Sequence, residues 1–436
     1  MKVITDLHLH SRFSRAVSKD MNLPTMASWA DKKGIGLLGT GDWTHPVWFR
    51  EISTFLKEKN EGIYQLIKGS NKCLFVLSTE LSSIYSQGGK ARRIHYLILS
   101  PNLDVSQKIN TILTKKGLNL LSDGRPILGI SPKEIVDIVL EIDDRCVIIP
   151  AHVWTPWFSL YGSVSGFDSI DECFGEYQKY IKAVETGLSS DPAMNWRIEE
   201  LTQRNIVSFG DAHSPAKLGR EATVLEMENL NFKNLREALF TKNHHNKILY
   251  TIEFYPEEGK YHFTGHRNCN IVYSPNETKK RGIICPVCGK KLTVGVMSRV
   301  EHLSTIDAEI ETKEDNYGVR WIGEKNANHA PYIMLVPLLE IIAEAESVTS
   351  ASKKVMGIYE YLTENLGGEF NVLLKTDLKE IEKLSGTRVS EAIAKVRKGD
   401  IYIEPGYDGI FGKVRIWTST PEANKSKQAI DQGALF

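Results

Sequence analysis

Histidine and acidic side chains recur at the ends of strand-like runs in this sequence. The first set is Asp6-Leu7-His8-Leu9-His10, which follows Val3-Ile4-Thr5, and the last is Gly210-Asp211-Ala212-His213. Because side chains alternate along a strand, His8 and His10 are expected to point to the same face. Two imidazole nitrogens directed at one point are typical of a binding site for a divalent metal ion.

Further polar residues of the same types lie between these two sets, each directly after or inside an apolar run: Asp42, His45, Glu80, His95 and His152. A single His-x-His pair is more often two surface histidines, so the prediction depends on the repetition. Polar residues at successive strand ends are typical of the mouth of an α/β barrel. Imidazole and carboxylate ligands together suit zinc, manganese, iron and magnesium, and clusters of them promote phosphodiester hydrolysis. The residues alone predict a metal-dependent phosphoesterase.

The order of these residues resembles the PHP (polymerase and histidinol phosphatase) superfamily of phosphoesterases. The resemblance implies an α/β fold, a distorted (βα)7 barrel, with metal ligands at His8, His10, Glu80, His95, His152, Asp211 and His213. The sequence departs from the superfamily pattern at Ser14-Arg15, where an Asp or His is usual. It departs again at Asp42-Trp43-Thr44-His45, where the superfamily usually has adjacent Asp and His. Asp42 and His45 both stay candidate ligands.

The ligand types suggest how such a site would work. A carboxylate that bridges two ions, either Glu80 or Asp211, would help to activate a bound water for in-line attack on phosphorus. We expect Asp211, Glu80 and His8 to carry the catalytic roles. The expected cofactors are zinc in the active site and magnesium or manganese for activity.

The cysteines separate a second region from the first. Cys73, Cys146 and Cys173 are scattered and are typical of thiols in a reducing compartment. The other three combine with a histidine as His266-x2-Cys269 and Cys285-x2-Cys288, separated by 15 residues. This spacing predicts a structural zinc ribbon, in which the metal supplies folding energy. His262 is an alternative to His266 as the fourth ligand.

The length of 436 residues, with 42% hydrophobic and 25% charged residues, is sufficient for several globular domains. We expect a barrel over residues 1–250, a zinc ribbon over 251–297, a mainly helical DNA-binding domain over 298–417 and a flexible tail over 418–436. Apolar residues at three- and four-residue spacing predict helices over 299–303, 332–347, 352–366, 376–384 and 388–398. The zinc ribbon would either follow the barrel in the sequence or be inserted within it.

The charge and hydropathy patterns bear on location and partners. The 54 basic and 54 acidic residues give zero net charge, which counts mildly against nucleic acid, although short basic clusters occur at 279–281, 290–291 and 395–398. The first residues lack the pattern of a signal peptide, and the apolar run over 332–343 is too short to span a bilayer. We expect a cytoplasmic protein without a membrane partner.

Over nearly its whole length the sequence resembles one branch of the PHP superfamily, endonuclease Q. The resemblance extends to Gly295-Val296-Met297-Ser298-Arg299-Val300-Glu301-His302-Leu303 and to Pro405-Gly406-Tyr407-Asp408-Gly409. It implies a DNA repair endonuclease that cuts on the 5′ side of uracil, hypoxanthine, xanthine and abasic sites. Two alternatives are a small-molecule phosphoesterase of histidinol-phosphatase type and a non-catalytic scaffold. The additional zinc ribbon argues against the first, and the nearly full ligand set argues against the second.

A deaminated base in a duplex must be recognised outside the base stack, so we expect base flipping. The candidate base pocket is the aromatic segment after His152, with Trp154, Trp157, Phe158 and Phe167, together with Tyr407 in a turn rich in glycine. The segment after His152 could instead be a rigid lid, and the turn around Tyr407 could be a plain β-hairpin.

The end of the chain contains a candidate linear motif. A polar stretch over 418–427 has no core-forming pattern, and Gln432-x-x-Leu435-Phe436 follows it. This pentapeptide resembles the peptides with which bacterial repair and replication proteins bind the sliding clamp. We expect Gln432, Leu435 and Phe436 to bind a clamp, and the alternative is an arbitrary frayed terminus.

Overall fold

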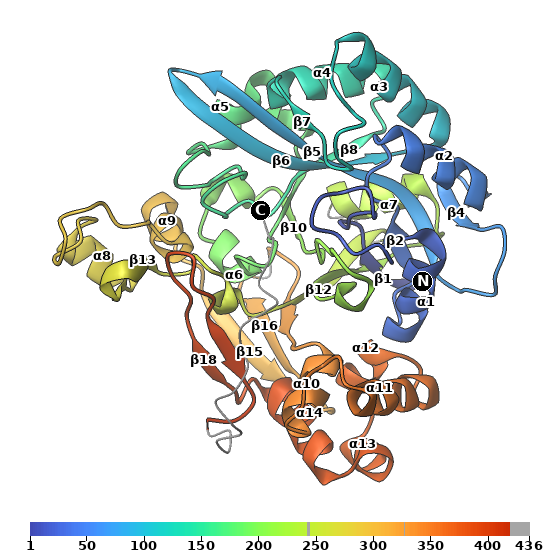
Figure 1. Cartoon of the computed structure of the whole chain (residues 1–436), viewed down its shortest axis with the longest axis vertical. Helices are drawn as coiled ribbons and strands as arrows, with labels where there is room; N and C mark the ends of the chain where they lie inside the picture. The colour runs from blue at the N-terminus through green and yellow to red at the C-terminus, as the bar shows by residue number, and fades with distance from the viewer. Residues whose placement is uncertain (242–244, 327, 419–436) are drawn as a thin grey trace.

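The structure is a computed structural model that describes residues 1–241, 245–326 and 328–418. Its centre is a distorted barrel of short, mostly parallel strands (Figure 1). The barrel strands are β1 (Lys2–Asp6), β2 (Leu37–Gly39), β5 (Leu74–Gln87), β6 (Lys90–Ser100), β8 (Val147–Pro150), β9 (Ala183–Glu185) and β10 (Asn205–Val207). The α/β class and the barrel that the sequence predicted are confirmed.

The distortion of the barrel has two sources. Strand β6 runs antiparallel to both β5 and β8, so β5 and β6 form a long hairpin inside an otherwise parallel arrangement. The strand ladder is also interrupted between β8 and β9 and between β10 and β1, where single backbone bonds join the segments that follow the strands. Val153 N donates to Glu185 O at 3.1 Å, and His10 N donates to Ala212 O at 3.1 Å. These bonds bring the loops after four strands to one mouth.

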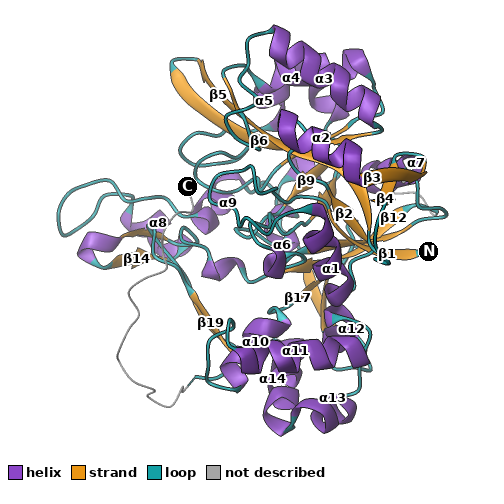
Figure 2. Cartoon of the chain, turned by 45° about the vertical axis from the view of Figure 1, so that its right-hand side comes forward, coloured by secondary structure: helices purple, strands orange, loops and turns teal. Residues whose placement is uncertain are grey.

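Helices cover the outside of the barrel. They are α1 (Leu23–Lys33), α2 (Pro46–Phe55), α3 (Leu103–Lys115), α4 (Pro132–Ile142), α5 (Ile170–Phe174), α6 (Pro192–Asn195) and α7 (Phe232–Phe240). Their N-termini follow the local sequence, because Asn22, Asn102 and Ser131 each accept a hydrogen bond from a backbone N–H of the first turn. Figure 2 shows α3 and α4 together on one side of the β5–β6 hairpin.

The barrel sheet continues beyond the barrel. Strand β11 (Ala222–Glu226) pairs with β1, β12 (Lys247–Glu253) pairs with β11, and β17 (Tyr332–Met334), β16 (Arg320–Glu324) and β15 (Ile310–Glu314) follow in that order. At the other edge the sheet continues through β4 (Ile63–Leu66) and β3 (Leu56–Asn60), and β7 (Ile127–Leu128) pairs with β5. The region 298–417, which we expected to be mainly helical, therefore also contains three strands of the central sheet.

The predicted helix over 332–347 is wrong in its first part. Tyr332–Met334 form β17, paired in parallel with β12, and the helix α10 spans only Leu338–Ala345. Pro337 fixes the backbone φ at −57° and precedes the first helical residue, so the helix starts there. The apolar run is continuous because both the strand and the helix are buried, and a continuous run carries no period that would separate them.

The remaining predicted helices of this region are confirmed within a few residues. The C-terminal helices are α10 (Leu338–Ala345), α11 (Lys353–Asn365), α12 (Glu369–Leu374), α13 (Leu378–Ser385) and α14 (Thr387–Lys398). They form the helical module at the lower end of Figure 1. The module packs on the barrel, where Lys33 Nζ of α1 lies 2.8 Å from Glu369 Oε2 of α12, with both side chains buried.

The zinc-ribbon segment projects to the left in Figure 1. It contains β13 (Thr264–His266), β14 (Ile271–Tyr273), α8 (Pro275–Arg281) and α9 (Val296–Leu303), with a 3-10 turn at Arg267–Cys269. The C-terminal hairpin of β18 (Tyr402–Glu404) and β19 (Lys413–Arg415) returns to this segment. Phe263 N donates to Gly406 O at 2.9 Å, so the turn between β18 and β19 packs on the base of the ribbon.

Candidate metal centre

Four side chains, from the loops after β1 and β10 and from within β5, converge at the barrel mouth. One ligand atom from each of His8, His10, Glu80 and Asp211 lies within 4.8 Å of the others. His10 Nε2 is 3.2 Å from both Glu80 Oε2 and Asp211 Oδ1, and His8 Nε2 is 3.5 Å from Glu80 Oε2. Both histidines and Glu80 are fully buried. The four residues can therefore hold a cation in a site shielded from solvent.

A second group of ligand atoms shares Glu80 with the first. His95 Nδ1 lies 2.8 Å from Glu80 Oε1, and His152 Nε2 lies 3.1 Å from the same oxygen. The two carboxylate oxygens of Glu80 thus face different groups, Oε1 towards His95 and His152, and Oε2 towards His8 and His10. This arrangement suits two neighbouring ions joined by one carboxylate.

The hydrogen bonds around His8 and His10 determine which ring nitrogen faces the centre. His8 Nδ1 lies 2.9 Å from Glu185 Oε1, and His10 Nδ1 lies 2.9 Å from Asp42 Oδ1. A carboxylate can only accept, so each Nδ1 carries a proton and each Nε2 faces the centre, where it can bind a metal ion once its own proton is displaced. Both Nε2 atoms and Asp211 Oδ1 are buried without a hydrogen-bond partner in the described part of the chain. Unpartnered acceptors directed at one another fit a metal ion between them.

The electrostatics of the centre also fit a bound metal ion. Burial alone would lower the pKa of His8 and His10, but the surrounding carboxylates outweigh it and raise each pKa well above the ordinary value. Burial alone would raise the pKa of Glu80, but His95, Arg125 and His8 hold it well below its usual range. The carboxylates are therefore ionised at neutral pH, and a bound metal ion would displace protons from the imidazoles.

Asp42 and His45 lie outside the two groups of converging atoms. Asp42 Oδ1 binds His10, while Oδ2 accepts hydrogen bonds from Ser11 N, Ser11 Oγ and Ser14 Oγ at 2.6 to 2.9 Å. His45 caps helix α2, where its Nδ1 accepts from Trp48 N at 3.4 Å, and its ring stacks on Phe13. In this structure Asp42 orients His10, and His45 starts a helix.

His213 is close to the centre but is not part of either group. Its Nδ1 lies 2.7 Å from the backbone oxygen of Asp211, and its ring contacts that of His10 edge-on, with centroids 4.9 Å apart. Several residues of the mouth have unusual backbone conformations for side chains with a Cβ. Asp42, His152 and Asp211 have φ of 50°, 30° and 43°. Such strain is often found where a backbone turn must direct a side chain into a functional site.

Sequence reasoning missed three residues of the centre. Glu185 binds His8 and also accepts from His152 N at 2.9 Å. Asp6 accepts from Gly210 N at 2.9 Å and Gly219 N at 2.8 Å, which holds the loop before Asp211. Arg125 donates to Glu80 Oε2 at 3.0 Å. Glu185 ends the strand-like run Ala183-Val184 and follows the same strand-end pattern, whereas Arg125 lies in an irregular segment without a comparable signal.

The five proposed base-pocket residues are not together. Trp154 is fully buried and donates to Asn195 Oδ1 at 2.8 Å, and Phe167 is covered by the Arg92 guanidinium at 4.0 Å. Trp157 contacts Tyr261, and Tyr407 donates to Asn270 Oδ1 at 3.0 Å. Phe158 alone adjoins the metal centre, where its ring lies 4.9 Å from that of His95.

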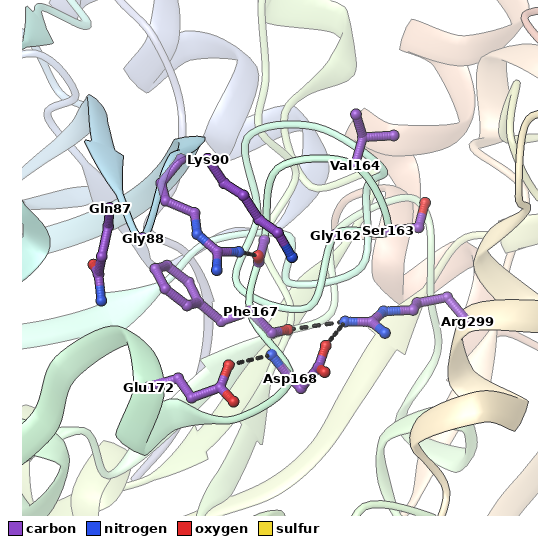
Figure 3. A pocket seen from close by; sticks show the side chains of 12 residues that line it. Gln87, Gly88, Lys90, Gly162, Ser163, Val164, Phe167, Asp168, Glu172 and Arg299 are labelled. Carbon is purple, nitrogen blue, oxygen red and sulfur yellow. Dashed lines mark hydrogen bonds and ion pairs between the residues drawn. The ribbon is translucent and has the colours of Figure 1, made fainter.

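A separate pocket of about 430 Å³ lies at the tip of the β5–β6 hairpin. Its lining includes Lys90, Phe167, Asp168 and Arg299 but none of the converging metal ligands (Figure 3). Arg299 of α9 donates to Phe167 O at 3.0 Å and to Asp168 Oδ1, as the dashed lines in Figure 3 mark. This pocket therefore lies where the barrel loop meets the zinc-ribbon segment.

The ribbon ligands also converge. One ligand atom from each of His266, Cys269, Cys285 and Cys288 lies within 4.8 Å of the others, and His262 is not in this group. Burial would raise the pKa of the Cys285 thiol, but the backbone N–H of Cys288 and the His266 side chain outweigh it and lower the pKa to about 6. A thiolate held by backbone amides is ready to bind zinc.

Comparison with known proteins places this fold and site in a family. A model of the MJ0043 C-terminal domain matches residues 337–400. The uncharacterized protein MJ0043 of Methanocaldococcus jannaschii is 35% identical over 305 residues, which cover 67% of this chain and 36% of that protein. The uncharacterized protein YqxK of Bacillus subtilis is 27% identical over 95% of this chain and 99% of its own length.

Two solved structures match nearly the whole chain. The lesion-specific endonuclease PfuEndoQ from Pyrococcus furiosus is 30% identical, with a TM-score of 0.80 over 96% of this chain and 98% of that one. A structure of endonuclease Q with a 27-mer duplex that has an abasic lesion at its active site is 31% identical. It covers 97% and 99% of the two chains, also with a TM-score of 0.80. The chain belongs to the endonuclease Q family.

Proposed function

We propose that this chain, a metal-dependent DNA endonuclease, hydrolyses the phosphodiester on the 5′ side of uracil, hypoxanthine, xanthine and abasic sites. The observation that carries the proposal is the set of buried, unpartnered ligand atoms on His8, His10 and Asp211, which meet at the barrel mouth beside Glu80. The full-length similarity to an endonuclease Q that was solved with an abasic duplex supports DNA as the substrate.

The two groups of ligand atoms suit a pair of divalent ions, and we assign zinc to them, with magnesium or manganese as further activating ions. Bound ions would supply an activated water and stabilise negative charge at phosphorus. A closed zinc site of His266, Cys269, Cys285 and Cys288 would have a structural role only, because all four positions are filled by protein ligands.

The residues of the chain supply the geometry of this reaction. Glu185 and Asp42 keep Nδ1 of His8 and His10 protonated, so both Nε2 atoms stay directed at the centre. Asp6 fixes the two backbone amides that position the loop of Asp211. Burial of Glu80 and both histidines excludes bulk water, which strengthens their interaction with a charged ligand. We infer that Glu80, Asp211 and His8 are the residues with the largest effect on the rate.

We place the reading of a flipped nucleotide beside Phe158. Its ring lies next to His95, and the Arg93 guanidinium lies 5.4 Å from the ring centroid. An aromatic face with an adjacent cation suits an unstacked base or an empty abasic sugar. Trp154 and Phe167, which belong to the same segment, are buried in the apolar core. Phe158→Ala should therefore weaken lesion binding more than it lowers the rate of the bound complex.

A panel of substrates tests the function. The metal-loaded protein is incubated with matched duplexes that contain uracil, hypoxanthine, xanthine, an abasic site or no lesion, and separately with p-nitrophenyl phosphate. We expect a single nick 5′ of each lesion, and turnover of the small monoester slower by at least about a hundredfold. Faster turnover of the monoester, with no nick in any duplex, would instead assign the chain to small-molecule phosphoesterases.

We also propose that Gln432, Leu435 and Phe436 bind a sliding clamp. These residues lie outside the described part of the chain, so the proposal rests on the sequence pattern alone. A short motif on a linker would raise the concentration of the enzyme on clamped DNA. Deletion of residues 432–436 should abolish clamp binding in a pull-down with the cognate clamp while nicking of a free oligonucleotide persists. Undiminished clamp binding by the truncated chain would refute the motif.

A further inference from the structure

In the described part of the chain, Arg125 is the one arginine or lysine whose side chain contacts Glu80, the residue shared by the two groups of ligand atoms. It comes from the irregular segment between α3 and β7, and its Nη1 donates to Glu80 Oε2 at 3.0 Å. Glu80 Oε2 is also the oxygen that faces Nε2 of His8 and His10. A quarter of the Arg125 side chain is exposed, so the guanidinium connects the buried centre with the solvent at the mouth.

The backbone around Arg125 is built to hold it there. Strand β7 pairs in parallel with β5, and Ser82 N donates to Pro126 O at 3.3 Å, only two residues along β5 from Glu80. Gly124 N donates to Phe13 O at 3.1 Å. A Cβ on Gly124 would lie 2.3 Å from both Asp42 Oδ2 and Ser14 Oγ, so only glycine lets the segment pass this close to the centre.

The charge of Arg125 suggests a ligand beyond Glu80. A guanidinium has five N–H donors, and in the described part of the chain its only side-chain hydrogen bond is to Glu80. A buried carboxylate can be held without a cation, as Asp6 is held by two neutral backbone amides. Holding Glu80 in place therefore does not by itself require an arginine. A permanent positive charge beside a metal site repels the metal ions and therefore costs free energy. An anion bound across the mouth would compensate this cost.

We propose that Arg125 is a catalytic residue that binds a nonbridging oxygen of the scissile phosphate. Arginine suits this role because its planar fork can bind a phosphate oxygen with one edge while the other edge stays on a carboxylate. The negative charge on the phosphate oxygens grows during hydrolysis, so a donor fixed at this position stabilises the transition state more than the ground state. This assignment rests on the proposed function.

The test compares metal-loaded wild type with Arg125→Ala and Arg125→Lys. Arg145→Ala serves as the matched control, because Arg145 is an exposed arginine that pairs with Asp143 and Glu61. Single-turnover rates at saturating substrate are measured with an abasic duplex and with bis(p-nitrophenyl) phosphate, a diester without a base. Metal content is measured on each protein, and guanidinium chloride is titrated into the Arg125→Ala reaction.

We expect Arg125→Ala to lose at least about a hundredfold in single-turnover rate on both substrates. Its metal content should stay that of wild type, guanidinium should restore part of the rate, and Arg125→Lys should be intermediate. A wild-type rate in Arg125→Ala would overturn the assignment. Loss of metal without rescue by guanidinium would overturn it as well, because Arg125 would then only position Glu80.

The two substrates separate the failure of this assignment from the failure of the proposed function. If wild type cleaves the diester but never the lesion duplex, the proposed DNA substrate is wrong, and the Arg125 variants are judged on the diester. If wild type nicks the duplex and Arg125→Ala does so equally fast, only the role of Arg125 is wrong. If wild type cleaves neither compound, both conclusions are refuted.

Discussion

Glu185 connects two histidines of the candidate metal centre. Its carboxylate accepts from His8 Nδ1 at 2.9 Å and from the backbone N–H of His152 at 2.9 Å. Gly187, two residues later, has a φ of 59°, and a Cβ there would lie 2.4 Å from His152 Cβ. The segment after β9 is therefore fitted closely against His152. A change at Glu185 should alter the orientation of both histidines without removing either ligand.

We predict that Glu185→Gln lowers metal affinity about 10- to 100-fold. The amide loses the charge that favours a protonated Nδ1 on His8, so the Nε2 lone pair is less available to a cation. Isothermal titration of the metal-free protein with zinc or manganese measures the affinity. Gln65→Glu is a control of opposite charge change on β4, outside both ligand groups, and should bind metal like wild type. An unchanged affinity in Glu185→Gln would show that Glu185 does not support the site.

The zinc-ribbon segment is attached to the barrel through helix α9. Arg299 donates to Tyr161 O at 2.9 Å and to Phe167 O at 3.0 Å, and Arg197 lies 2.6 Å from Glu301. The four candidate ribbon ligands lie outside this attachment. In the described part of the chain, the small apolar cluster around them has Tyr273, Cys285 and Leu292 as its buried residues, and Cys285 is itself one of the four. Because a core of this size contributes little folding free energy, we expect the segment to need a bound metal ion to stay folded.

Cys285→Ser should remove one equivalent of zinc and lower the melting temperature of the ribbon segment. DNA affinity should fall with it, while the single-turnover rate of the bound complex should change much less, because the barrel mouth is built from other elements. Cys146→Ser, at a buried thiol outside the ribbon, is the matched control for zinc content. Elemental analysis decides the assignment, since a Cys285→Ser protein with the full zinc content of wild type would rule out the ribbon site.

A buried acidic pair lies at the end of strand β12. Glu253 is fully buried, and Thr186 Oγ1 and Ser208 Oγ donate to its Oε2 at 3.2 and 2.9 Å. Burial raises the pKa of Glu253 to about 8, and burial together with Glu253 raises that of Glu221 well above its ordinary value. The folded protein therefore keeps a proton on Glu253 that the unfolded chain releases above its ordinary pKa of about 4.5.

This difference in proton binding makes Glu253 a source of pH-dependent stability. Its contribution is fully present below about pH 4.5 and is lost as the pH rises towards 8, because only the folded state still binds the proton in that interval. Glu253→Gln removes this proton equilibrium. We expect its melting temperature to fall less steeply than that of wild type between pH 5 and 8, as measured by calorimetry. Parallel slopes for the two proteins would contradict a protonated Glu253.

The sequence alone was sufficient to predict the elements whose residues show a clear local pattern. The sequence predicted that His8, His10, Glu80 and Asp211 meet at one mouth, because a strand fixes the direction of its side chains. Glu80, however, lies within β5 and not at its end. The boundary between β17 and α10 was missed because both are buried and apolar. Arg125 was missed because its approach to Glu80 depends on the pairing of β7 with β5, which only the folded chain brings about.

One sheet connects most parts of the molecule. It runs from β15 near the helical module through β12 and β11 to the barrel strands and on to β3. The buried pair of Lys33 and Glu369 joins the barrel to the helical module. Within the module, the buried Arg397 side chain donates hydrogen bonds to the backbone oxygens of Leu373, Val372 and Thr376. The basic cluster expected over 395–398 therefore contains one arginine with a structural role, unable to contact DNA.

This continuity bears on how the molecule would bind a duplex. The zinc-ribbon segment is joined to the barrel loop by Arg299, which donates to Phe167 O at 3.0 Å, and to the C-terminal hairpin by Arg267 N, which donates to Asp408 Oδ2 at 2.7 Å. A fixed arrangement of these three parts reduces the entropy that binding would otherwise cost, so we expect a lesion duplex to bind without large domain motion.

No helix in the described ranges is long and apolar enough to cross a membrane.

We propose that the residues at the barrel mouth cut DNA at a lesion. The most direct measurement is the cleavage of an end-labelled duplex with one abasic site by metal-loaded wild type, His8→Ala and Asp211→Ala, with folding checked by circular dichroism. We predict one wild-type product, cut on the 5′ side of the lesion, and rates at least about a hundredfold lower in both folded variants. Cleavage at the wild-type rate by both variants would show that the barrel mouth is not the active site.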